Sequence, residues 1–257
     1  MKGNASAMVR PQTAATTSLN DEVRIISKLK YLEKIEQKIE EDLEQFVYRR
    51  GDKEKKNKKG IRLTKQLIVD SCQCDSLAEV TTIFLRDKNL EFFDEPNPGS
   101  KDSFKFEDMV SLECVYASHN LIRDVYGISQ ITRLSELNLS FNQIQDVSPL
   151  QQLKQLTKLY LNRNKIGVID PLCSLTKLQV LGLFHNEIFN FDQTLDTLTT
   201  LGVTYCLKEI SIDGNPITST TKFKNSLLLS IPSLEMLDDE RVQELDREVA
   251  QQYFEMH

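Results

Sequence analysis

The segment "LSELNLSFNQIQDVSPLQQLKQ", residues 134–155, is followed at once by "LTKLYLNRNKIGVIDPLCSLTK", residues 156–177. Leucine, asparagine, isoleucine and proline fall at the same offsets in both segments, while the residues between them change. A fixed period of this length is typical of an array in which each repeat is one structural unit. Further copies lie on both sides of this pair.

The repeat has apolar residues at positions 1, 4, 6, 11, 14, 17 and 20 and asparagine at position 9. The six copies begin at Val80, Leu112, Leu134, Leu156, Leu178 and Leu207. The second, third and fourth copies fit every position, whereas the fifth is seven residues longer. The first copy carries Lys88 in place of asparagine and has a ten-residue excess near residues 94–103.

Positions 4 and 6 alternate with polar neighbours, so each repeat predicts a short strand with one buried face. Successive strands then lie side by side in a parallel sheet with one continuous core. Twenty-two residues leave room for only a short helical turn on the far side, where Pro149 and Pro171 interrupt longer helices. The sequence therefore predicts an α/β solenoid.

The asparagine at position 9 is predicted to form a ladder, because its amide both donates to and accepts from backbone groups left unpaired at the bend. The ladder residues are Asn120, Asn142, Asn164, Asn186 and Asn215. Lys88 cannot accept a hydrogen bond, so we expect the first repeat to be an irregular end unit.

This pattern resembles the leucine-rich repeat proteins, in particular the short 22-residue subfamily. That subfamily includes a regulatory subunit of protein phosphatase 1, the spliceosomal A-prime subunit, axonemal dynein light chain 1 and several ciliary proteins. The resemblance implies a right-handed solenoid with a parallel sheet on its concave face. The segment from Asn215 to Val242 is similar to the C-terminal cap of the family, with Phe223, Leu227 and Leu237 in the places of the cap.

Outside the array, the chain divides by composition. We expect a flexible tail at 1–20, an amphipathic or coiled-coil-like N-terminal helix at 21–48 and a basic linker at 49–62. The six repeats with an N-terminal cap, in which Thr64 caps a short helix, occupy 63–218. The C-terminal cap and an acidic helix with Val242, Leu245 and Val249 at helical spacing occupy 219–257.

The basic linker "RRGDKEKKNKK" is either a solvated spacer or a contact for an acidic surface such as tubulin tails. The residues for such a contact are Arg49, Arg50, Lys53, Lys55, Lys56, Lys58 and Lys59. The absence of interleaved aromatic residues argues against direct nucleic-acid binding. The helix at 21–48 either folds back on the solenoid or pairs with another chain.

Composition and motifs argue against an enzyme. The chain has no phosphate-binding loop, and its histidines and five cysteines lack the spacing of a metal site, so we expect no metal and no cofactor. Cys114 and His119 lack an orienting acid. The odd number of scattered cysteines favours a reducing compartment, and no apolar run is long enough to span a membrane. We therefore expect a cytoplasmic location.

Residues at positions 3, 5, 7 and 8 are predicted to lie on the concave side. Tyrosine, phenylalanine, histidine and arginine are enriched there although only 7% of the chain is aromatic, and these residue types anchor protein interfaces. Exposed strand positions also favour aromatic residues without any partner. The predicted partner-binding residues are Tyr116, His119, Phe141, Tyr160, Arg163, Phe184 and His185.

The sequence predicts a non-catalytic scaffold that binds a protein on this face. The resemblance implies a structural component of the ciliary or flagellar axoneme, with axonemal dynein, radial-spoke or tubulin-lattice proteins as partners. Two alternatives are open: a regulatory subunit of a protein phosphatase, and a spliceosomal scaffold that holds an RNA-binding protein.

Overall fold

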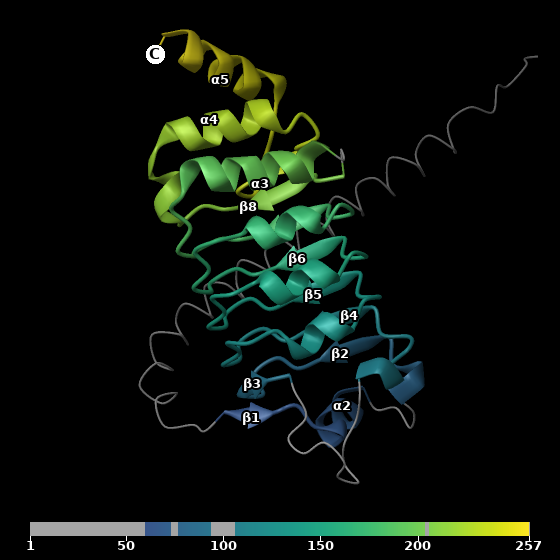
Figure 1. The fold of residues 1–257 in the computed structure, drawn as a ribbon. Helices are drawn as coiled ribbons and strands as arrows, with labels where there is room; N and C mark the ends of the chain where they lie inside the picture. The colour runs from purple at the N-terminus through teal and green to yellow at the C-terminus, as the bar shows by residue number, and fades with distance from the viewer. Residues whose placement is uncertain (1–59, 73–76, 94–105, 204–205, 257) are drawn as a thin grey trace, which may run out of the picture. The chain divides into compact units, whose positions relative to one another are not determined.

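The structure is a computed structural model that describes residues 60–72, 77–93, 106–203 and 206–256 (Figure 1). All of these residues belong to one structural unit, Lys59–His257. The predicted tail at 1–20, the predicted helix at 21–48 and the basic residues at 49–59 lie outside the described residues. The same holds for the excess near residues 94–103.

Each repeat contributes one three-residue strand at positions 3–5, in which a buried apolar residue lies between two residues that are half-buried or exposed in most repeats. The strands are β2 (Thr82–Phe84), β4 (Cys114–Tyr116), β5 (Glu136–Asn138), β6 (Lys158–Tyr160), β7 (Val180–Gly182) and β8 (Glu209–Ser211). They pair in parallel and in constant register, with Leu137 opposite Leu159 and Leu159 opposite Leu181. Equal repeat positions therefore stack from coil to coil, and the predicted α/β solenoid with a parallel sheet is confirmed (Figure 1).

Most repeats carry a 3₁₀ helix in place of a long helix. In η4 (Ser148–Gln152) and η5 (Asp170–Ser174), proline occupies one of the first two positions. An N–H group at the start of a helix has no partner within the helix, so proline loses no hydrogen bond there. This agrees with the prediction for Pro149 and Pro171. The remaining 3₁₀ helices are η1 (Leu77–Glu79), η2 (Phe106–Asp108), η3 (Gly127–Gln130) and η6 (Pro216–Ser219).

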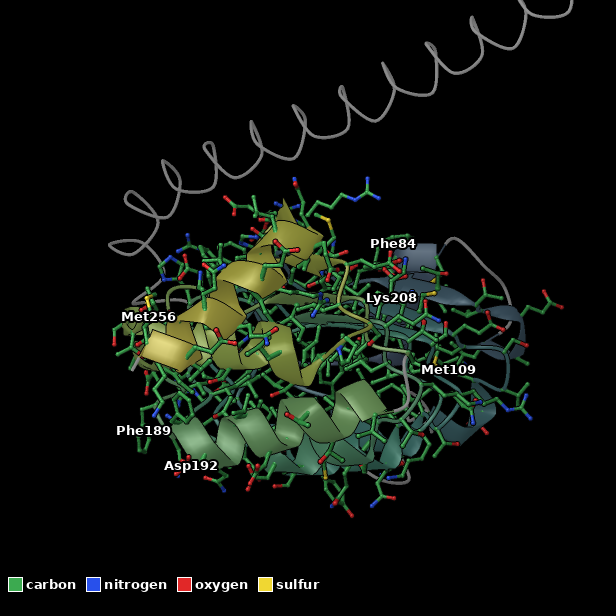
Figure 2. The ribbon with its side chains drawn as sticks, turned by 90° about the horizontal axis from the view of Figure 1, so that it is seen from above. Phe84, Met109, Phe189, Asp192, Lys208 and Met256 are labelled. Atoms are coloured by element: carbon green, nitrogen blue, oxygen red, sulfur yellow. The ribbon has the colours of Figure 1, made fainter. Side chains whose placement is uncertain are left out.

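The seven extra residues of the fifth repeat are accounted for by α3 (Phe191–Val203), a full α-helix. Gln193 and Thr197 both donate side-chain hydrogen bonds to the Asp170 carboxylate, which ties α3 to η5 of the preceding coil. Figure 2 looks along the coil and shows Asp192 of α3 and Phe84 of β2 on opposite sides of the molecule, with side chains filling the space between them.

The apolar repeat positions form one core that runs through all the coils. Leu137, Leu159 and Leu181, which occupy position 4 in successive repeats, are completely buried. Burial of a leucine side chain contributes about 2 kcal/mol. Because each coil covers the leucines of its neighbours, this contribution depends on the stacking of the coils.

The five asparagines at position 9 form the expected ladder between coils. Asn164 accepts a hydrogen bond from the Ile144 N–H at 3.0 Å through Oδ1, and its Nδ2 donates to the carbonyl oxygens of Leu139 and Leu161, both at 3.0 Å. Equivalent bonds are made by Asn120, Asn142, Asn186 and Asn215. Each side chain is at most 8% exposed, so the backbone groups it satisfies have little access to water.

The first repeat is irregular at the position of Lys88. The N–H groups of Lys88 and Leu90 both donate to Asn120 Oδ1 of the next coil, at 3.0 Å. The chain then forms β3 (Leu90–Phe92), which pairs with β1 (Ile61–Arg62) in a separate two-stranded parallel sheet. Residues 61 and 62, placed in the basic linker by the sequence, are therefore part of a strand.

Both ends of the array carry caps. At the N-terminal end, Thr64 Oγ1 accepts from the Leu67 N–H at 3.2 Å and begins α2 (Lys65–Cys72), as predicted. The C-terminal cap consists of α4 (Thr221–Ser230), β9 (Met236–Leu237), β10 (Glu240–Arg241) and α5 (Glu244–Met256). The cap residues Phe223, Leu227 and Leu237 are buried.

In the C-terminal cap, Asp238 directly follows β9, whose Leu237 lies opposite Ile210 of β8. Its Oδ1 accepts from the N–H groups of Ile212 and Asp213, both at 2.7 Å, and its Oδ2 lies 2.7 Å from Lys224 Nζ. The Asp238 carboxylate thus supplies the acceptor for two backbone N–H groups at the end of β8.

The C-terminal helix differs from the prediction. The helical spacing predicted that Val242, Leu245 and Val249 share one face of a helix from Asp239 onward. In the structure α5 begins only at Glu244, and Leu245 and Val249 point to solvent while Ala250 is buried.

Replacing Asn164 with alanine should lower the free energy of unfolding by about 2 kcal/mol, because the buried Ile144 N–H loses its acceptor and the Leu139 and Leu161 carbonyls each lose one of two asparagine donors. Urea denaturation of the full chain measures this change. Gln145→Ala, at an exposed position of the preceding repeat, is the control and should change stability by less than about 0.5 kcal/mol. Equal midpoints for the two variants would show that the ladder does not hold the coils together.

Candidate functional site

Position 8 of each repeat lies just beyond the end of its strand, where the chain turns inward. The backbone there is left-handed in every coil, with φ of 58° at His119, 58° at Phe141, 54° at Arg163 and 52° at His185. Only Gly214, in the last coil, adopts this conformation without a steric penalty. For the other side chains the conformation costs about 1–2 kcal/mol per residue. The side chains at position 8 thus project from a strained turn that is repeated in each coil.

The position-8 side chains form a row across the coils. The His119 and Phe141 rings stack with centroids 4.1 Å apart, and the Arg163 guanidinium lies 5.3 Å from the Phe141 centroid. Arg163 also lies 5.5 Å from the Phe184 centroid, and Phe184 packs edge-on against His185 at 4.2 Å. Each cation–π contact of this kind contributes about 0.5–1 kcal/mol. These five side chains are named the ring row.

The ring row ends at Gly214. A Cβ atom at this position would lie 2.7 Å from Nδ1 of His185, so the imidazole rests directly on the glycine backbone. Burial lowers the pKa of His185, the Arg163 guanidinium lowers it further, and the Asp213 carboxylate opposes both effects. His185 is therefore neutral at pH 7, and the charge in the row is concentrated on Arg163.

A second group of side chains projects from the strands beside the ring row. The Tyr116 hydroxyl donates to Glu136 Oε1 at 2.8 Å, and Lys158 Nζ lies 3.3 Å from Glu136 Oε2. Phe84 stacks on Tyr116 with centroids 5.3 Å apart. Burial and the carboxylates of Glu136 and Glu209 raise the pKa of Tyr160 to about 12. Tyr160 therefore presents a neutral phenol at physiological pH.

The structure brings together most of the predicted site residues. Five of them make the ring row, and Tyr116 and Tyr160 lie on β4 and β6 with Glu136 of β5 between these strands. His119 and His185 are at opposite ends of the ring row. Six of the seven are partly buried and His185 is exposed.

The repeat pattern placed position 8 on the concave side with strand positions 3 and 5, but the predicted partner-binding residues did not include Phe84 or Glu136. Gly214 and Asp87 at position 8 are the available signal, because glycine and aspartate favour the left-handed turn that the structure shows there. The roles of Phe84 and Glu136 could not be read from the repeat pattern, because positions 3 and 5 vary freely.

Among the described residues, the candidate site is a surface of side chains and contains no cluster that could bind a metal ion. No group of three or more histidine, cysteine, aspartate or glutamate side chains in the described ranges could hold a metal ion. None of the described helices has the length and apolar character required to cross a bilayer. The arrangement offers aromatic faces, one guanidinium and tyrosine hydroxyls, which are groups that bind proteins.

Two models of leucine-rich repeat families match the sequence: "Leucine Rich repeats (2 copies)" at residues 110–152 and "Leucine rich repeat" at residues 132–188. No curated protein matches the sequence. An internalin from Listeria monocytogenes is similar in structure, with a TM-score of 0.51 and 22% identity over 67% of this chain. The match spans 54% of the internalin and shows the fold.

Two further solved structures are similar at lower scores. The SNF/U2A' complex of Drosophila melanogaster contains a chain that matches with a TM-score of 0.45 and 21% identity, over 76% of this chain and 92% of that one. A leucine-rich repeat protein of Leptospira interrogans matches with a TM-score of 0.44 and 28% identity, over 52% of this chain and 33% of that one.

The pKa of His185 should lie below that of a free histidine, and Arg163→Gln should raise it by removing the adjacent positive charge. Two-dimensional NMR of the imidazole resonances over pH 4–9 measures this pKa, with His185→Gln used for assignment. Lys165→Gln removes a charge in the same coil outside the ring row and should have a smaller effect. An unchanged pKa in Arg163→Gln would mean that the guanidinium does not lie beside His185 in solution.

Proposed function

We propose that this leucine-rich repeat protein is a non-catalytic scaffold that binds a partner protein through the ring row and the adjacent tyrosines. Leucine-rich repeat domains generally mediate protein–protein interaction. The partner-binding residues are Tyr116, His119, Phe141, Tyr160, Arg163, Phe184 and His185.

This proposal rests on the large side chains that occupy the left-handed turn at position 8. Glycine at position 8 would avoid the left-handed penalty, as Gly214 does, yet four successive coils hold His119, Phe141, Arg163 and His185 there. Backbone strain of this kind persists where the surrounding structure enforces it and is concentrated at functional sites. The contacts within the ring row offset part of the cost, and we infer that partner binding is what the arrangement serves.

The chemistry of the site indicates what it binds. The Arg163 guanidinium is held between two ring faces and makes no hydrogen bond to a described residue, so its N–H groups are available to carbonyl or carboxylate oxygens. The rings on either side offer apolar area at low entropic cost. An acidic or carbonyl-rich segment with apolar side chains is the partner surface that fits.

For the cellular role, we propose a structural component of the ciliary or flagellar axoneme, bound to dynein, radial-spoke or tubulin-lattice proteins. The support is the combination of a short array with a charged N-terminal extension, which resembles ciliary members of the subfamily. Two other roles, phosphatase regulation and a spliceosomal scaffold, use the same face and differ only in the partner.

Purification of native complexes from the source cells by a tag, followed by mass spectrometry, separates these roles. Axonemal proteins that resist detergent extraction would support the ciliary role. A soluble phosphatase or a ribonucleoprotein would contradict it while retaining the scaffold function.

Replacing Tyr160 and Phe184 together with alanine should abolish capture of the partner and lower the melting temperature by only a few degrees, since both side chains are partly exposed. The matched control is Tyr126→Ala with Phe189→Ala, which removes the same two residue types at 66% and 69% exposed positions outside the ring row. Pull-down of the partner and thermal unfolding give the two readouts. Equal loss of capture in both double variants would show that binding does not depend on the concave face.

A further inference from the structure

The C-terminal helix α5 is held to the cap through one of its faces. Ala250 is completely buried, and the Arg247 guanidinium donates to carbonyl oxygens of Leu228, Ile231, Pro232 and Leu234 at the end of α4. These carbonyls lie in the last turn of α4 or just after it, and that of Ile231 also accepts from the Leu234 N–H at 3.2 Å. Arg247 therefore fixes α5 on α4, at the end of the array (Figure 1).

The opposite face of α5 is apolar and open to solvent. Leu245 is 63% exposed, Val249 54% and Met256 74%. Spacings of four and seven residues place the three side chains along one side of the helix, together with Gln252. With a rise of 1.5 Å per residue, the eleven steps from Leu245 to Met256 give a stripe about 16 Å long. These three residues are named the α5 stripe.

A negative edge borders the α5 stripe on one side. Glu244, Glu248 and Glu255 follow one another at the same helical spacings, about a quarter turn from the stripe. Among the described residues, none of the three carboxylates forms an ion pair, and Glu255 accepts only a 3.3 Å hydrogen bond from Gln251. The last turn of α5 contains no basic residue, so Glu255 also lies unfavourably near the negative end of the helix dipole.

We propose that the α5 stripe is a second docking surface and that its occupant is an amphipathic helix of another protein with basic residues along one flank. The aliphatic side of such a helix covers Leu245, Val249 and Met256. Its lysines or arginines lie against Glu244, Glu248 and Glu255 and compensate the helix dipole. This surface is separate from the ring row and independent of the partner bound there.

The α5 helix of a second copy fits this surface poorly. Within α5 the only basic residue is Arg247, which is already bonded to the α4 carbonyls. In an antiparallel pair of α5 helices, each flank of one helix lies against the same flank of the other. Glutamates would therefore face glutamates. In a parallel pair the glutamate edge would face Asp246 and Tyr253, which bring no cation. The α5 helix of a second copy therefore supplies no positive charge to the glutamate edge.

The test uses the full-length protein and two synthetic 21-residue helical peptides with leucine at heptad positions a and d. One peptide carries lysine on one flank, and the other carries glutamate at the same positions. Fluorescence anisotropy at 50 mM salt should show binding of the lysine peptide at least tenfold tighter than that of the glutamate peptide. Binding should weaken as salt is raised, because the flank contacts are exposed.

Two variants of α5 and two control variants decide the outcome. Leu245→Ser with Val249→Ser should weaken binding of the lysine peptide at least tenfold, and Glu244→Lys with Glu248→Lys should transfer the preference to the glutamate peptide. Phe189→Ser, an exposed apolar position away from α5, should bind like the unchanged chain. Tyr160→Ala with Phe184→Ala should also bind normally, which separates this surface from the proposed function. All of these positions are exposed or half-exposed, and circular dichroism verifies the fold.

Equal binding of both peptides, or of neither, would overturn the proposal. So would a preference that does not change with the charge reversal on α5. A concentration-dependent dimer in analytical ultracentrifugation that disappears in the Leu245 and Val249 double variant would assign the surface to a second copy of the chain.

Discussion

The concave face depends on the hydrogen bonds that the ladder asparagines make to two coils at once. Asn164 bonds to Leu161 of its own coil and to Leu139 and Ile144 of the previous one, so its amide fixes both the bend and the distance to the neighbour. Adjacent strands then lie about 4.8 Å apart. That spacing matches the contact distance of aromatic rings, which is why residues at equal positions, such as His119 and Phe141, stack directly.

The sequence was sufficient to predict the solenoid, its core and the asparagine ladder, because all three follow from a period that can be read directly. It was insufficient for the ring row. Whether Arg163 contacts Phe141 or Phe184 depends on the left-handed backbone at position 8, which a hydrophobic pattern does not encode. The hydrogen bond from Tyr116 to Glu136 likewise joins residues of different repeats whose identities the repeat leaves free.

The C-terminal helix shows a different limit of pattern analysis. Helical spacing predicted a helix, and the structure contains one, but the side that packs against the cap is chosen by Arg247 and Ala250. A guanidinium that satisfies several backbone carbonyls can orient a helix as firmly as an apolar side chain. Hydropathy treats arginine as a surface residue and therefore assigns the buried face to the wrong residues.

The terminal strands of the sheet have a consequence for solubility at high concentration. An open parallel sheet presents unpaired backbone groups at both edges and can template growth by addition of other chains. Here β10 pairs with β9 in the antiparallel direction and carries the exposed, oppositely charged Glu240 and Arg241, while at the other edge Cys72 Sγ of α2 donates to the Thr82 carbonyl of β2. Both edges therefore disfavour the addition of further strands, and we expect the molecule to resist end-to-end assembly into fibres.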